Sequence, residues 1–145
     1  MTDWDDLESS LAPAPAFPVE APDGRRDWSE LARQTTLFRL VHLRGPRILA
    51  YPIPNVGKRN PLTARREGIM AGVFDTRFEW RAPLTAVIEL KGYDKRGRPG
   101  VLSLPQIEYG NRMVELGHHA ACFFCPHNAV EWLRTLGFPV AAEAA

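Results

Sequence analysis

Two adjacent segments, VFDTRFEW (residues 73–80) and LTAVIELK (residues 84–91), alternate apolar and polar side chains with a period of two. This alternation is typical of strands with one face in a core, and only RAP, residues 81–83, separates the two segments. We therefore predict an antiparallel hairpin with a three-residue turn, in which Trp80 pairs with Leu84. In this register the residue numbers of every cross-strand pair sum to 164, so Asp75 lies opposite Glu89.

The predicted pairing of Asp75 with Glu89 brings two carboxylates together. Opposed residues on one face of a hairpin have Cβ atoms roughly 4.5 to 5.5 Å apart. Like charges at that distance destabilise the hairpin or raise a pKa, unless a cation lies between them. Because Mg²⁺ and Mn²⁺ prefer hard oxygen ligands, either ion is a suitable cofactor. Phe74, Phe78 and Trp80 are expected on the opposite face, toward the core.

Lys91 is expected to reach the same place as Glu89, because side chains on a strand repeat every second residue. An acidic pair, a lysine and a divalent ion suit phosphodiester hydrolysis, in which charge on the phosphate must be stabilised. The alternative is an ordinary surface ion pair between Glu89 and a lysine, since Glu-x-Lys is a common tripeptide.

The rest of the pattern predicts an α/β fold. We expect a helix over residues 28–43 that is capped by Ser29, a strand over 46–53 and a short helical piece over 62–70. After the hairpin, we expect a helix over residues 103–117 that stops at Gly117, a strand over 118–124, and a helix over 127–137. The order is helix, three strands, helix, strand, helix.

The chain divides into three predicted regions. Residues 1–27 are acidic and contain APAPAFPVEAP, in which repeated prolines remove backbone donors, so this region is expected to be a flexible arm. Trp4, Leu7 and Leu11 recur there at helical spacing and could form a helix that docks on a protein partner; plain disorder is the alternative. Residues 28–138 form the predicted domain, and residues 139–145 are a tail.

Charge is distributed unevenly along the chain. Residues 1–30 carry eight acidic and two basic side chains, whereas residues 41–100 carry twelve basic and five acidic ones. The basic middle favours a polyanionic partner such as DNA, although a solvated basic face is the alternative. We find neither a membrane-spanning run nor a signal peptide, so a cytoplasmic, non-secreted protein is expected.

The segments IPNVGKR, GIMAGVFDTRF, VIELKG and LSLPQIEYGNRMVELGH occur in this order over residues 28–138. This ordered set resembles the VRR-NUC family, the virus-type replication-repair branch of the PD-(D/E)xK nucleases. The resemblance implies a restriction-endonuclease-like core with a mixed β-sheet flanked by helices. It also implies a metal-dependent, structure-selective DNA endonuclease acting in repair or recombination, in which a homodimer cuts branched DNA such as four-way junctions.

The resemblance assigns roles to particular residues. It makes Asp75, Glu89 and the main-chain carbonyl of Leu90 metal ligands, with Glu30 as a further candidate. Glu30 could instead be only a favourable acid in the first turn of a helix. Lys91 becomes the catalytic lysine.

Gln106 matches a glutamine that the family carries on the helix after the Glu-x-Lys strand. The resemblance implies that this side chain touches phosphate or metal-bound water. Ser103 and Gln106 also form a Ser-x-x-Gln capping box, in which Gln106 would satisfy a backbone donor. Both roles remain open at this point.

Two basic segments are candidates for DNA contact. One belongs to the PNVGKR turn, and the other is the basic loop that follows the Glu-x-Lys strand. The alternative for this second segment is a solvated loop tip. Contacts of this kind position a phosphate without reading base sequence. The candidates are Asn55, Lys58, Arg59, Lys95, Arg96 and Arg98.

Three further alternatives concern zinc, catalysis and assembly. HHAACFFCPH offers ligand types that suit structural Zn²⁺, but Cys122 and Cys125 would face opposite sides of a strand, which favours packed cysteines.

A noncatalytic DNA-binding or protein-interaction module is the alternative to the enzyme. For a homodimer, Trp132 or Phe38 is the expected interface residue. The alternative is a monomer that buries both aromatic rings in its own core or covers them with the acidic arm.

Overall fold

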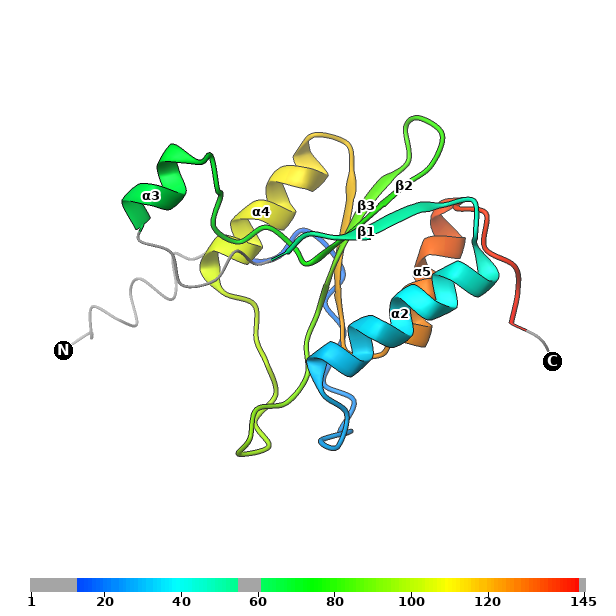
Figure 1. Ribbon diagram of the computed structural model, residues 1–145, viewed down its shortest axis with the longest axis horizontal. Helices are drawn as coiled ribbons and strands as arrows, with labels where there is room; N and C mark the ends of the chain where they lie inside the picture. Colours follow the sequence, from blue (N-terminus) through cyan, green and yellow to red (C-terminus); the bar gives the residue numbers. More distant parts are fainter. Residues whose placement is uncertain (1–12, 55–60, 144–145) are drawn as a thin grey trace.

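The computed structural model describes residues 13–54 and 61–143. Predicted residues that lie outside these ranges are Trp4, Leu7, Leu11, Asn55, Lys58 and Arg59. The fold is α/β, with a four-stranded sheet and helices packed against it (Figure 1). Within the described residues every helix is too short or too polar to cross a lipid bilayer. The elements in chain order are α2 (Glu30–Arg44), β1 (Leu49–Pro52), α3 (Pro61–Arg66), β2 (Thr76–Glu79), β3 (Thr85–Leu90), α4 (Leu104–Glu115), β4 (His119–Phe123) and α5 (Pro126–Leu136).

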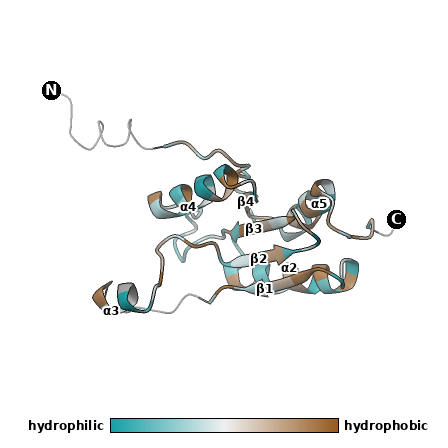
Figure 2. Ribbon diagram, turned by 90° about the horizontal axis from the view of Figure 1, so that it is seen from above, coloured by the Kyte–Doolittle hydropathy of each residue, from teal (hydrophilic) through white to brown (hydrophobic). Residues whose placement is uncertain are grey.

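The sheet is mixed and has the strand order β1-β2-β3-β4, which Figure 2 shows from above. β1, β2 and β3 are antiparallel neighbours, whereas β3 and β4 run parallel. A parallel pair needs a long crossover connection, and α4 lies within that connection. The predicted element order is confirmed, and α3 occupies part of the predicted helical piece.

The predicted hairpin register is confirmed. β2 and β3 pair Thr76 with Ile88 and Phe78 with Ala86, as expected for a sum of 164. The turn closes through a hydrogen bond from Trp80 N to Leu84 O at 3.1 Å. A shift of one residue would move every side chain to the other face, so this register decides which side chains reach the site.

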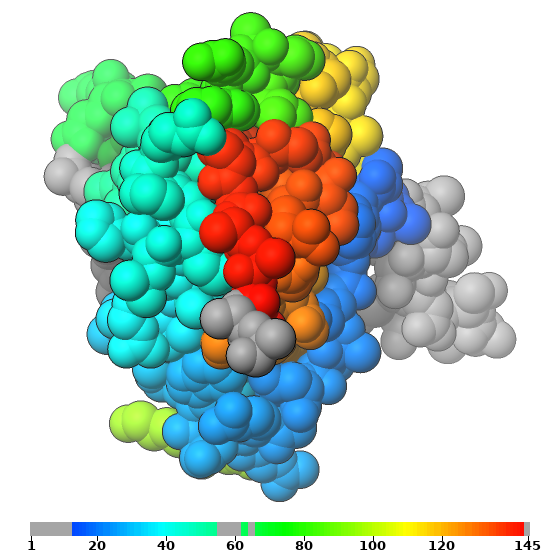
Figure 3. All heavy atoms as spheres, turned by 90° about the vertical axis from the view of Figure 1, so that its right-hand side faces the viewer, coloured from blue at the N-terminus to red at the C-terminus, as the bar shows by residue number. Residues whose placement is uncertain are grey.

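Two hydrophobic clusters cover the two faces of the sheet. On one face α2 and α5 supply Leu37, Val41, Val130 and Leu133, which pack with Phe78, Ile88 and Leu90. On the other face Met113 of α4 packs with Val87 and Cys122. Figure 1 shows α4 on one side of the strands and α2 with α5 on the other, and Figure 3 shows α2, α5 and the C-terminal segment side by side.

Phe74 does not follow the predicted alternation. We expected it on the face of Phe78 and Trp80, but it packs in the other cluster, where its ring centroid lies 5.6 Å from that of Phe17 and 5.2 Å from that of Tyr109. The physical reason is that β2 begins only at Thr76, so strand alternation does not extend back to position 74.

The helix ends follow local sequence signals. Ser29 caps α2 by accepting a hydrogen bond from Ala32 N at 3.1 Å. Ser103 and Gln106 form a complete capping box at the start of α4. α5 ends at Gly137, whose φ of 105° lies in the left-handed region that glycine adopts without strain.

Residues 16–23, part of the predicted flexible arm, pack against the domain. Phe17 is only 7% exposed, and a Cβ atom added at Gly110 would lie 2.3 Å from its ring. Val19 forms a parallel bridge with Cys122 at the outer edge of β4. The free edge of β4 offers unpaired backbone groups, which explains why an extended segment binds there. The described part of the tail also packs, because Val140 is buried.

Glu20 completes the start of α5 from a distance in sequence. Cys125 is the N-cap residue of α5 but makes no side-chain capping hydrogen bond. Instead, the Glu20 carboxylate accepts hydrogen bonds from Phe124 N at 2.9 Å and from Cys125 N at 2.8 Å. A carboxylate at a helix N-terminus is also stabilised by the helix dipole.

We predict that Phe17→Ala lowers the free energy of unfolding by about 3 kcal/mol, because large aromatic residues in packed sites leave a cavity when truncated. Leu31→Ala is the control, since Leu31 is 74% exposed on α2 and should change stability by less than about 0.5 kcal/mol. Urea unfolding of the two variants gives the comparison. Equal stability of Phe17→Ala and wild type would mean that residues 16–23 do not contribute to the domain.

Candidate active site

Three carboxylates converge near the C-terminal end of β3. Glu30 comes from the first turn of α2, Asp75 precedes β2, and Glu89 is the penultimate residue of β3. Each offers a carboxylate oxygen, and these oxygens all lie within 4.8 Å of one another. The pairing predicted for Asp75 and Glu89 therefore occurs, and Glu30 joins them.

Glu89 is the most enclosed of the three carboxylates, at 2% exposed. Its Oε2 accepts a hydrogen bond from the backbone N of Asp75 at 3.0 Å. Its Oε1 accepts a hydrogen bond from Gln106 Nε2 at 2.9 Å and lies 3.5 Å from Lys91 Nζ. A buried carboxylate held by two hydrogen bonds and an ion pair has a defined orientation, which a ligand for a cation needs.

Gln106 has two roles in the structure, and the capping box is one that the sequence predicted. Its side-chain oxygen accepts from Ser103 N at 3.0 Å and completes the capping box. The same oxygen accepts a hydrogen bond from Lys91 Nζ at 3.0 Å, while its amide nitrogen binds Glu89. Gln106 therefore connects the start of α4 to both charged residues at the end of β3.

Burial dominates the electrostatics of the cluster. Loss of hydration and, after it, the nearby Asp75 charge raise the pKa of Glu89 to about 7, against the opposing effect of Lys91. Loss of hydration also raises the pKa of Asp75 and that of Glu30. Clustered carboxylates with raised pKa values are expected where a bound cation would otherwise compensate the charge.

Two helices begin at this cluster. α2 starts at Glu30, and α4 starts two residues before Gln106. The N-terminus of a helix carries a partial positive charge and favours anions, including phosphate groups. The site therefore combines ligands for a cation with a field that attracts an anion.

A cavity of about 530 Å³ opens beside Asp75 and Gln106. One wall comes from residues 69–73, where a Cβ atom added at Gly72 would lie 2.2 Å from the carbonyl oxygen of Pro105. Gly72 has a φ of 84°, so this close contact depends on glycine for both space and conformation. Asp75 is the one member of the carboxylate cluster among the described residues that line this cavity.

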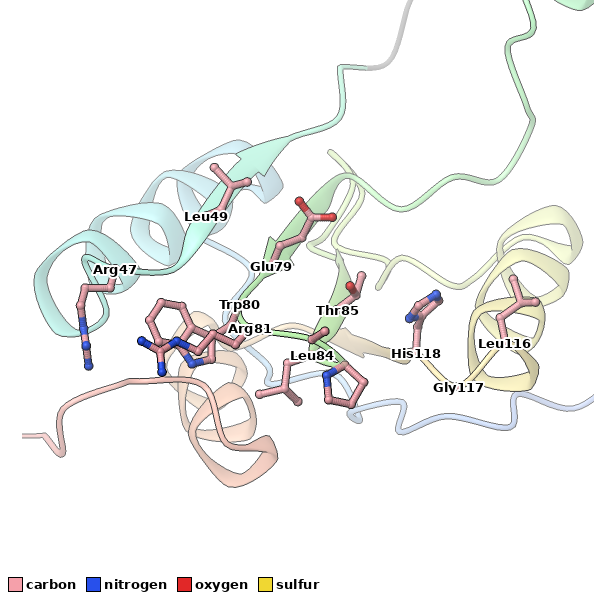
Figure 4. A pocket seen from close by; sticks show the side chains of 12 residues that line it. Arg47, Leu49, Glu79, Trp80, Arg81, Leu84, Thr85, Leu116, Gly117 and His118 are labelled. Carbon is pink, nitrogen blue, oxygen red and sulfur yellow. The ribbon is translucent and has the colours of Figure 1, made fainter.

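A larger cavity, of about 820 Å³, lies at the hairpin turn and is drawn in Figure 4. Trp80, Leu84 and Leu116 supply apolar surface there, and Glu79 is the one carboxylate among the described residues that line it. It therefore lies at the opposite end of β3 from Glu89. Glu30, Asp75 and Glu89 are absent from the described lining of this larger cavity.

Sequence reasoning missed Arg33, which is 0% exposed on α2, one turn after Glu30. Its guanidinium pairs with Asp23 at 2.7 Å and donates to Phe124 O at 2.6 Å and Arg25 O at 2.7 Å. Arg33 thus joins α2 to residues 23–25 and to the end of β4. A lone arginine in an amphipathic helix carries no local signal of burial, because its partners are distant in sequence.

The remaining predicted site residues fall into three groups. Leu90 ends β3 between Glu89 and Lys91. Lys95, Arg96 and Arg98 lie exposed on the loop that follows, where Arg98 pairs with Asp94 at 2.8 Å. Asn55, Lys58 and Arg59 lie outside the described residues.

The alternative zinc ligands are not gathered. Cys122 is buried in β4 beside Val87, and burial raises the pKa of its thiol to about 12. Cys125 is a separate free cysteine at the start of α5. Among the described residues, the group of Glu30, Asp75 and Glu89 alone brings three potential ligand atoms together.

The arrangement has the chemical parts of a divalent cation site. Carboxylate oxygens are the ligands that Mg²⁺ and Mn²⁺ prefer, and the Lys91 ammonium group lies beside them. Comparison of the chain with protein-family models, with curated proteins and with solved structures found no match.

We predict that the metal-free protein loses stability as the pH rises from about 4.5 to about 7. Glu89 titrates near 4.5 when unfolded and at about 7 when folded. Between these values the folded protein binds more protons than the unfolded chain, so the free energy of unfolding falls with pH, by at most about 3 kcal/mol.

Urea unfolding across this pH range, with a chelator present, measures the effect. Glu89→Gln removes the titrating group, so its stability should change less over the same range. Identical pH profiles for the variant and the wild type would contradict the assignment to Glu89.

Proposed function

We propose that this protein is a divalent-metal-dependent, structure-selective DNA endonuclease of the VRR-NUC type with a PD-(D/E)xK core. The observation that carries the proposal is the cluster of Glu30, Asp75 and Glu89, with Lys91 Nζ 3.5 Å from Glu89. Nuclease chemistry needs a cation and a positive side chain at one phosphate, and this cluster offers ligands for the cation beside the Lys91 ammonium.

The proposed reaction adds water across a phosphodiester bond. The water oxygen bonds to phosphorus, the bond to the leaving oxygen breaks, and that oxygen receives a proton. A bound Mg²⁺ or Mn²⁺ ion would polarise the phosphate and stabilise its charge. Glu30, Asp75 and Glu89 would hold the ion.

Lys91 and Gln106 have distinct parts in this reaction. The Lys91 ammonium would stabilise the charge that develops on the attacked phosphate. Gln106 would keep Lys91 in place, because its side-chain oxygen accepts the hydrogen bond from Lys91 Nζ. Gln106 also holds Glu89, so loss of its amide would disturb the charged groups on both sides.

DNA is the proposed substrate because the surroundings of the site favour a polyanion. The N-termini of α2 and α4 meet there, and the exposed loop with Lys95 and Arg96 leaves β3 directly after Lys91. Branched DNA, such as a four-way junction, is the proposed target, because the segments around Asp75, Glu89 and Gln106 resemble those of the VRR-NUC family.

The alternative function is a noncatalytic DNA-binding or protein-interaction module that retains this fold. A labelled four-way junction and a matched linear duplex, each with and without Mg²⁺, distinguish the two. Cleavage that depends on Mg²⁺ and prefers the junction supports the endonuclease, whereas binding without cleavage supports the module.

We predict that Asp75→Asn, Glu89→Gln and Lys91→Ala each lower the rate of junction cleavage by at least about 100-fold, because each removes charge needed in the transition state. DNA binding should persist, since the basic loop is unchanged. Glu79→Gln is the matched control, because Glu79 lines the other cavity at the hairpin turn. Wild-type rates in the three variants would remove the active-site assignment.

We also propose a homodimer, because a junction with near two-fold symmetry needs two matched cuts. The Phe38 ring stacks on that of Phe78, with centroids 6.1 Å apart, and the centroids of the Trp132 and Phe123 rings are 5.8 Å apart. Both expected interface residues therefore already pack partly within the chain.

Light scattering at micromolar concentration tests the dimer. A dimer of the 16.3 kDa chain has a mass of about 33 kDa. A mass of one chain would mean that Phe38 and Trp132 serve the monomer core alone.

A further inference from the structure

Two turns from distant parts of the chain lie side by side next to the candidate active site. One spans residues 23–28 and the other spans residues 93–99. Gly24 N donates a hydrogen bond to the Tyr93 hydroxyl at 2.7 Å, and a Cβ atom added at Gly97 would lie 3.3 Å from Arg26 Cδ. Figure 1 shows both turns projecting at the bottom of the molecule.

The first turn is held from inside. The buried Arg33 side chain binds Asp23 at 2.7 Å, Arg25 O at 2.7 Å and Trp28 O at 2.8 Å. These contacts use the backbone and the acidic side chain of the turn. The Arg25 and Arg26 side chains are therefore left exposed, with the Arg25 guanidinium 4.7 Å from the centroid of the Trp28 ring.

The second turn is also ordered by its own contacts. Asp94 Oδ1 accepts hydrogen bonds from Arg96 N and Arg98 N, each at 2.9 Å, and Asp94 Oδ2 pairs with Arg98. Among the described residues, neither Lys95 nor Arg96 forms an ion pair, and both are exposed.

The combined surface carries an excess of positive charge. Its basic members are Arg25, Arg26, Lys95, Arg96 and Arg98, and its acidic members, apart from the Asp23 that pairs with Arg33, are Asp27 and Asp94. The Coulomb attraction of such a cluster for a phosphate backbone is strong at low salt and independent of base sequence.

The surface adjoins the cluster of carboxylates. A Cβ atom added at Gly92, directly after Lys91, would lie 2.9 Å from Glu30 N. Four residues of extended chain from Gly92 to Arg96 span at most about 14 Å, the length of roughly four base-pair steps of duplex DNA.

We infer that Arg25 and Arg26 join Lys95 and Arg96 in a phosphate-binding ridge, which holds duplex DNA a few base pairs from the cleaved bond. The inference rests on the proposed endonuclease function and deepens it. It gives residues 23–28 a role in substrate binding, whereas the sequence predicted that residues 1–27 form a flexible arm.

The test is binding of a fluorescent linear duplex to the full chain, with a chelator in place of metal, over a range of salt concentrations. Arg25→Ala with Arg26→Ala should weaken binding on the order of tenfold and lower the slope of log affinity against log salt by about two. Lys95→Ala with Arg96→Ala should give the same change, which covers the case in which the first pair unfolds.

Arg47→Ala with Arg81→Ala is the matched control. It removes the same charge at the opposite end of the sheet, where both guanidinium groups lie over the Trp80 ring. The control should keep the wild-type salt slope.

Each outcome bears on the ridge separately from cleavage. Unchanged slopes in both ridge variants, or an equal change in the control, would overturn the ridge, as would wild-type protein that does not bind the duplex. Wild-type binding of the duplex with the expected slopes, but no cleavage of the four-way junction in Mg²⁺, would overturn the endonuclease and leave the ridge standing.

Discussion

The antiparallel register of β2 and β3 is the constraint on which the candidate chemistry depends. It brings Asp75 beside Glu89, whose Oε2 accepts the backbone hydrogen bond of Asp75 at 3.0 Å. A slip of one residue would turn Glu89 and Lys91 toward the hydrophobic cluster of Ile88 and Leu90. The hydrophobic face of the hairpin therefore stabilises the placement of its charged face, and burial of Glu89 raises its pKa to about 7.

Polar contacts from three other elements hold this arrangement together. Gln106 connects the start of α4 to Glu89 and Lys91, and Arg33 joins α2 to the end of β4. Arg33 is fully buried, and each of its side-chain nitrogens donates a hydrogen bond. A buried charge of this kind is costly unless fully paired, so its pairing favours one geometry over alternatives.

The segment before α2 contributes more than its composition indicates. Glu20 caps α5 across the molecule, and Asp23 neutralises the buried Arg33. These contacts keep residues 23–28 against the loop after β3 and let Arg25 and Arg26 face outward. The proposed DNA-binding surface thus depends on the same contacts that complete the core.

The sequence by itself determined the features that depend on neighbouring residues. Period-two alternation and a three-residue turn predicted the pairing of Asp75 with Glu89, and capping signals predicted the starts of α2 and α4, because these rules act over a few residues. Only the tertiary structure decided that Phe74 packs on the other face and that Gln106 serves two roles. It also decided that Arg33 is buried and that residues 16–23 cover the edge of β4. Those outcomes depend on which distant surfaces meet, and local periodicity carries no information about such contacts.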